Sequence, residues 1–77
     1  MQIRIEYPAP MRLPGTPSGS AVELAAGAAV ADLLAKLGIE PRHRAHIAAF
    51  VGGARVPPNH PLADGDLVLL QVPISGG

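Results

Sequence analysis

Polar and apolar residues alternate with a period of two at the start of the chain, where residues 2–7 read QIRIEY. One side of such an extended segment carries Ile3, Ile5 and Tyr7 and the other only polar residues, which predicts a half-buried strand. The next thirteen residues, PAPMRLPGTPSGS, hold four prolines and two glycines, so we expect a loop that is mobile at its tip. Residues 21–24 (AVEL) then predict a second, shorter strand, which would complete a hairpin with a long connection.

The period changes to that of a helix in the middle of the chain. Val30, Leu33, Leu34 and Leu37 lie at positions i, i+3, i+4 and i+7, which predicts a helix with a single apolar stripe. An alanine precedes this stripe where a capping side chain is usual, so we expect packing to stabilise the helix more than its own ends do. A helical turn from Pro41 and a strand over residues 47–51, closed by a glycine pair, are expected next.

Turn-forming residues fill positions 54–66, ARVPPNHPLADGD, and we predict no strand there. Leu62 is expected to reach the core from this stretch, and the two carboxylates of Asp64 and Asp66 are expected to accept hydrogen bonds from backbone N–H groups of the turn. Residues 67–74, LVLLQVPI, predict a final strand that is apolar on both sides. Such a strand is usually central in its sheet, or has one face that awaits a partner.

The alternation within this final strand separates two sets of side chains. We assign Val68, Leu70 and Val72 to the core, and the intervening positions to the opposite face of the sheet. A slip of one residue in register would exchange the two sets. The whole pattern predicts an α+β fold in one domain, with the elements in the order β-β-α-β-turns-β.

Composition narrows the class of protein further. The 77 residues are 48% hydrophobic and 16% charged, which is typical of a globular domain, and only one Phe, one Tyr and no Trp are present. The six Lys and Arg balance six Asp and Glu, which gives no electrostatic reason to expect nucleic acid or an anionic membrane as a partner. With no cysteine, no signal peptide and no long apolar run, we expect a cytoplasmic protein without disulfides or thiol chemistry.

Other candidate sites in the sequence are weak. His43, His46 and His60 suggest a metal site only loosely, and surface histidines are the stronger interpretation, so we expect no bound metal. Ser18 and Ser20 have no convincing His and Asp partners, so a hydrolase triad has no support.

The order of elements, together with three segments, resembles the β-grasp, ubiquitin-like sulfur carriers of the MoaD/ThiS group. These segments are AVEL with GAAVADLLAKLG, FVGG, and PLADGDLV followed by a short strand and a terminal Gly-Gly. The resemblance covers essentially the whole chain, residues 1–77. It implies a mixed sheet of four or five strands with one main helix across one face, and a flexible tail over residues 73–77.

In such carriers the terminal carboxylate is the reactive group, so the resemblance gives that role to Gly77 and makes Gly76 part of a tail that must thread a narrow channel. The chain would then be a protein substrate and not an enzyme. An E1-like enzyme of the MoeB/ThiF type would use ATP to adenylate the carboxylate, a persulfide would convert it to a thiocarboxylate, and the carrier itself would bind no cofactor. Glycine suits this role because it has no Cβ beside the reactive carbon.

Molybdopterin synthesis is the pathway we favour, because the Ser-Gly-Gly ending and the proline-bearing first loop look more like that branch. The chain would then be the small subunit of molybdopterin synthase, and the large subunit would accept the sulfur. Thiamin-thiazole synthesis, tRNA thiolation, a ubiquitin-like modifier and a β-grasp module with an inert tail remain alternatives. We expect the partner to contact the open face of the sheet and the tail, through Arg4, Leu67, Leu69, Gln71, Pro73, Ile74 and Ser75.

Overall fold

The computed structural model describes residues 1–9 and 11–72 of the chain. Two strands, two short helices and three further strands follow one another along it, in the α+β arrangement that the sequence predicts. Their bounds are β1 Gln2–Glu6, β2 Ala21–Glu23, α1 Val30–Lys36, α2 Pro41–Arg44, β3 Ala48–Val51, β4 Ala54–Val56 and β5 Leu67–Gln71. No described helix is long and apolar enough to cross a membrane.

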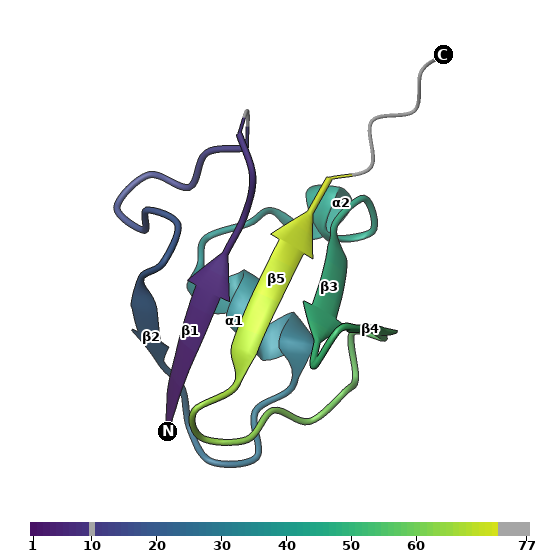
Figure 1. The fold of residues 1–77 in the computed structure, drawn as a ribbon. Coiled ribbons are helices and arrows are strands. Elements are labelled where there is room, and N and C mark those ends of the chain that lie inside the picture. The colour runs from purple at the N-terminus through teal and green to yellow at the C-terminus, as the bar shows by residue number, and fades with distance from the viewer. Residues whose placement is uncertain (10, 73–77) are drawn as a thin grey trace.

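All five strands form one mixed sheet in the spatial order β2-β1-β5-β3-β4. β5 is the central strand, parallel to β1 and antiparallel to β3, as the apolar character of both its sides predicts. Figure 1 shows α1 behind the sheet, and no described helix covers the face of β1 and β5 that is turned toward the viewer. This is the β-grasp arrangement, with one covered and one open face of the sheet.

The core lies between α1 and the covered face. Ile3 and Ile5 of β1, Leu33 of α1, and Val68 and Leu70 of β5 are fully buried. Leu62, from the turn-rich stretch, is 5% exposed and packs into the same cluster, as predicted. Aliphatic side chains therefore fill the interior of the described structure without help from large aromatic ones.

Val72 does not belong to this core, so the prediction that placed it there is wrong. The final strand ends at Gln71, earlier than the expected Ile74, and Val72 is 45% exposed. Its backbone has left the sheet, so the alternation that buries Val68 and Leu70 no longer sets the direction of its side chain. Val72 therefore belongs to the surface at the end of β5.

The turn at Asp64–Asp66 fixes the start of β5 against the start of β1. The Gln2 N–H donates to Asp64 Oδ1 at 2.7 Å and the Ala63 N–H donates to Asp66 Oδ2 at 2.8 Å, so both carboxylates act on the backbone as predicted. The Gly65 N–H also donates to the Gln2 carbonyl at 2.8 Å. These bonds set the register in which Arg4 lies opposite Leu67.

Strand β4 was not predicted from the sequence. It pairs antiparallel with β3 through a two-residue turn, in which Gly52 and Gly53 adopt φ values of +61° and +83°. Two successive positive φ angles match the twist of a β-hairpin, and glycine reaches them without steric cost. The glycine pair was read as the end of a strand, although it also begins the return strand.

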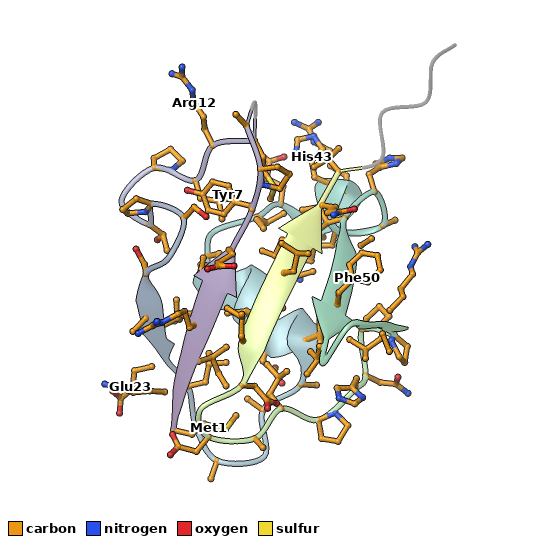
Figure 2. All side chains as sticks on the ribbon, in the orientation of Figure 1. Met1, Tyr7, Arg12, Glu23, His43 and Phe50 are labelled. Carbon is orange, nitrogen blue, oxygen red and sulfur yellow. The ribbon has the colours of Figure 1, made fainter. Side chains whose placement is uncertain are left out.

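Two further polar contacts order the connections. The Asp32 carboxylate accepts a hydrogen bond from the Ala29 N–H at 2.8 Å, so α1 is capped from its third residue and not from the cap position. In the loop after β1, the Tyr7 hydroxyl donates to the Thr16 carbonyl at 2.6 Å and the Ser18 hydroxyl oxygen accepts from the Tyr7 N–H. Figure 2 shows Tyr7 beside this loop.

Candidate functional site: the open face of the sheet

The residues expected to contact a partner divide into two groups. Arg4, Leu67, Leu69 and Gln71 are described by the structure. The other group lies outside the described residues, so their roles stay predictions: Pro73, Ile74, Ser75, Gly76 and Gly77. The first group and the strand that leads toward the second can therefore be placed in the fold.

Strand register brings the first group together on the open face. Arg4 of β1 is the pairing partner of Leu67 of β5, and Leu69 lies two residues further along β5 on the same side. Leu67 is 44% exposed and Leu69 is half-buried, whereas Val68 and Leu70 between and beyond them are fully buried. Gln71 continues the exposed set. The predicted assignment of Leu67, Leu69 and Gln71 to the open face is correct.

Sequence reasoning missed two residues of this face, Glu6 and Phe50. Leu69 lies opposite Glu6 on β1 and opposite Phe50 on β3, so the three side chains form one row across the sheet. Phe50, the single phenylalanine of the chain, is half-buried there (Figure 2). Its place in a short alternating strand could have indicated the face, had the pairing of β3 with β5 been known.

These side chains line a shallow hollow of about 440 Å³ over β5 and β3. Its walls include Glu6, Phe50, Leu67 and Leu69, and the glycine turn between β3 and β4 forms one end. Arg55, the pairing partner of Phe50 on β4, extends the row, so an acid and a base stand at the two ends of an apolar centre. An apolar centre with a charged rim is the usual composition of a protein-binding surface.

The other candidate side chains that the sequence offered do not gather into one site in the described structure. No group of three His, Asp or Glu side chains among them could hold a metal ion, so His43, His46 and His60 do not form one site. The carboxylates of Asp64 and Asp66 are occupied by backbone N–H groups. The open face therefore stays the candidate site among the described residues.

The profile of the ThiS family matches residues 5–77. No curated protein matches the chain. Among solved structures, a putative molybdopterin converting factor subunit 1 from Pyrococcus furiosus is 22% identical with a TM-score of 0.75, and the alignment covers 95% of this chain and 98% of that one. The H. volcanii small archaeal modifier protein 1 is 20% identical with a TM-score of 0.74, over 95% and 98% of the two chains.

A complex of subunits 1 and 2 of the molybdopterin-converting factor from Helicobacter pylori 26695 also matches, at 20% identity and a TM-score of 0.65, over the full length of both chains. At these identities the structural likenesses show the fold, which is the ubiquitin-like β-grasp. The family profile covers all but the first four residues. The chain therefore belongs to the ThiS family, as a small protein with the ubiquitin-like β-grasp fold.

Proposed function

We propose that this protein is a sulfur carrier whose terminal Gly77 carboxylate is adenylated and then converted to a thiocarboxylate. The observation that carries the proposal is the match of the ThiS profile through Gly77, on a scaffold whose central strand leads toward that residue. The absence of cysteine supports it, because no side chain of this chain can hold sulfur as a persulfide.

The chemistry requires two transfers at the same carboxyl group, the first to its oxygen and the second to its carbon. A carboxylate oxygen attacks the α-phosphorus of ATP and pyrophosphate leaves, which makes the carboxyl carbon electrophilic. The terminal sulfur of a donor persulfide then attacks that carbon and AMP leaves. A thiol cleaves the S–S bond of the resulting acyl persulfide, so that the thiocarboxylate is released and the thiol ends in a disulfide. The carrier contributes the reacting carbon, and its partners contribute the ATP site and the sulfur.

Molybdopterin synthesis is the pathway we favour for the sulfur. Two of the structures that share the fold are named as molybdopterin-converting factor subunits, and one of these is a complex of subunit 1 with subunit 2. By analogy, the acceptor of this chain would be a large subunit that docks on the open face, and the activating enzyme would be of the MoeB/ThiF type. The thiamin-thiazole and tRNA-thiolation pathways would use the same terminus.

A protein modifier is the second candidate, favoured by the likeness to the H. volcanii small archaeal modifier protein 1. In that case the activated Gly77 carbon would be attacked by a lysine amine of a target, with loss of AMP and a proton, and an amide bond would form. Lys36 is the only lysine of this chain, so attachment of one copy to another through a lysine has one possible position.

Intact-mass analysis distinguishes these candidates. The chain is incubated with ATP, its cognate activating enzyme and a persulfide donor. A carrier gains the mass of one oxygen-to-sulfur exchange, and a modifier gives amide adducts on target lysines, of which the self-adducts disappear in Lys36→Arg. Deletion of Gly77 is expected to abolish both products while circular dichroism shows an unchanged fold. Conversion that survives this deletion contradicts the proposal.

A further inference from the structure

A groove of about 580 Å³ lies where β5 ends, away from the hollow on the open face. The loop after β1, the turn between α1 and α2, and the residue that follows β5 form its walls. In Figure 1 the loop and α2 stand on either side of the end of β5. We call it the tail-base groove. Its large apolar side chains are half-buried or exposed, and they are Met11, Leu13, Leu37, Ile47 and Val72.

Met11, Leu13, Leu37 and Ile47 pack against the edge of the core with one side and leave the other side exposed to solvent. Val72 is 45% exposed although it lies immediately after the central strand of the sheet. The four other apolar residues of the groove are only half-buried. Contiguous apolar surface on a small protein usually marks a site of interaction.

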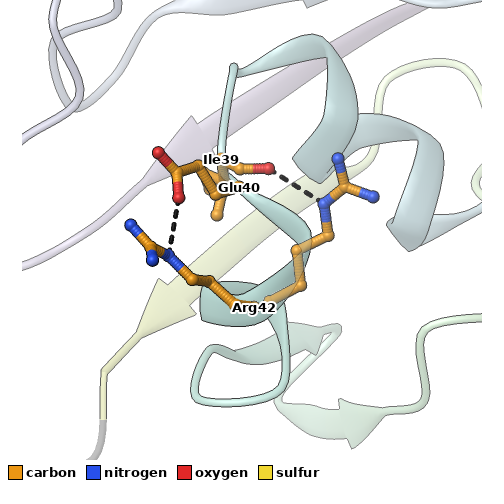
Figure 3. A network of polar contacts seen from close by, with 4 residues as sticks. Ile39, Glu40 and Arg42 are labelled. Carbon is orange, nitrogen blue, oxygen red and sulfur yellow. Dashed lines mark hydrogen bonds and ion pairs between the residues drawn. The ribbon is translucent and has the colours of Figure 1, made fainter.

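One wall of the groove is held in place without a partner. The Arg44 Nε donates to the Ile39 carbonyl at 2.9 Å, and the Arg42 Nε lies 2.7 Å from a carboxylate oxygen of Glu40. Figure 3 shows the pair of Arg42 and Glu40 beside Ile39. The His46 N–H also donates to the His43 carbonyl at 3.1 Å. The short helix α2 and its flanks are therefore ordered before binding, which lowers the entropic cost of docking.

The length of the remaining chain places the groove near any enzyme that acts on Gly77. Five residues follow Val72. A fully extended chain spans roughly 3.5 Å per residue, so the terminal carbon lies no further than about 18 Å from Val72. An enzyme that closes its active site around the terminus must bring its surface over this end of the carrier.

The charges on the groove indicate the chemistry of that surface. Arg12, His43 and His46 line the groove, and Glu40 is the single acidic residue among the described residues that do so. Glu40 is already paired with Arg42. Figure 2 shows Arg12 and His43 at the same end of the molecule, with Arg12 projecting from the loop. The groove therefore offers hydrogen-bond donors and positive charge around an apolar floor.

We propose that the tail-base groove is a docking site for the enzyme that charges Gly77, and that it receives an apolar side chain of that enzyme flanked by a carboxylate. This inference rests on the proposed sulfur-carrier function and adds a second contact to the one expected on the open face. Both contacts would form in the same complex, one on the open face of the sheet and one at the end of β5. The groove would supply affinity and register, and the reacting carbon would remain that of Gly77.

The test measures the rate of thiocarboxylate formation against the concentration of the full-length carrier, with the activating enzyme, ATP and persulfide donor held constant. Val72→Asp is compared with Ala54→Asp, which adds the same charge at an exposed position outside the groove. Arg12→Glu is compared with Lys36→Glu, an equal charge reversal on an exposed residue that does not line the groove. Urea unfolding is recorded for each variant.

We expect Val72→Asp to raise the KM for the carrier about tenfold, the size typical of one important interface side chain. Arg12→Glu is expected to raise it severalfold, and both variants are expected to keep kcat and stability near the wild-type values. The two control variants are expected to change KM less than twofold. This split between KM and kcat is what a docking contact produces when it does not touch the reacting atoms.

Equal KM values in the groove variants and in their controls would overturn the groove as a docking site while leaving the carrier function intact. If only Arg12→Glu leaves the KM unchanged, the part of the proposal that places a carboxylate of the enzyme beside the groove is overturned. If the wild-type chain is not converted at all, the proposed function itself fails. The two failures are thus separated by the wild-type reaction.

Discussion

The two sides of β5 have nearly the same composition and opposite surroundings. Val68 and Leu70 face α1 and are fully buried, whereas Leu67 is 44% exposed and Leu69 half-buried on the open face. Figure 1 shows the reason: the helix α1 crosses only one side of the sheet. The comparison shows that apolar character alone does not separate a core residue from a surface residue. What covers the residue decides between the two.

We therefore expect side chains on the covered side of β5 to contribute mainly to stability, and those on the open side mainly to binding. A side chain removed from the covered face leaves a cavity, whereas a side chain removed from the open face leaves only water. If the comparison is right, the two faces should respond to substitution through different measurements. The three predictions below test this division, from the largest expected effect to the smallest.

Leu70→Ala should have the largest effect. Truncation of a fully buried leucine costs about 2–5 kcal/mol of unfolding free energy, which is a large part of the stability of a domain this small. Urea denaturation followed by circular dichroism measures the loss. The matched variant Leu67→Ala on the open face is expected to stay within about 0.5 kcal/mol of wild type. Equal losses in the two variants would break the comparison.

Leu67→Asp should affect binding without affecting folding. The side chain lies beside Arg4 on an exposed surface, so a carboxylate there is tolerated by the fold but opposes burial in an apolar interface. We expect the affinity for the partner that receives the terminus to fall about tenfold, which corresponds to about 1.4 kcal/mol. Titration calorimetry with the activating enzyme or the acceptor subunit measures it. An unchanged affinity would remove the open face from the interface.

Asp64→Ala should have the smallest effect of the three. It deletes the acceptor of the 2.7 Å hydrogen bond from the Gln2 N–H, which holds the ends of β1 and β5 together. The site is exposed, so we expect a loss of about 0.5–1 kcal/mol in unfolding free energy. Asp64→Asn keeps an oxygen acceptor and should retain most of the stability. A larger loss in the asparagine variant than in the alanine variant is incompatible with this role.

Much of the fold could be read from periodicity. The alternation of Ile3 and Ile5, the stripe of α1 and the Asp64–Asp66 turn each point to a single local structure, and the structure confirms all three. The assignment of Leu67 and Leu69 to the open face also held, because strand alternation transmits burial from one residue to the next. These features are local, and local patterns determine them.

What the sequence did not reveal depends on pairing across the chain. Strand β4 is three residues long and two prolines follow it, so its strand state comes from pairing with β3 and not from its own residues. Phe50 lies on the open face because β3 pairs with β5, a pairing that the sequence alone does not show. Val72 was assigned to the core because alternation was extended past the end of the strand, although the next residue in the sequence, Pro73, is a local signal for such an end.

The position of β5 between β1 and β3 also determines when this protein can fold during its synthesis. A chain still being synthesised on the ribosome holds β1 and β2 long before β5 is available to join them. Until then the sheet has no centre, and the apolar sides of β1 and β3 remain wet. Folding of the sheet is therefore a late event, so a truncated translation product that lacks β5 would not fold.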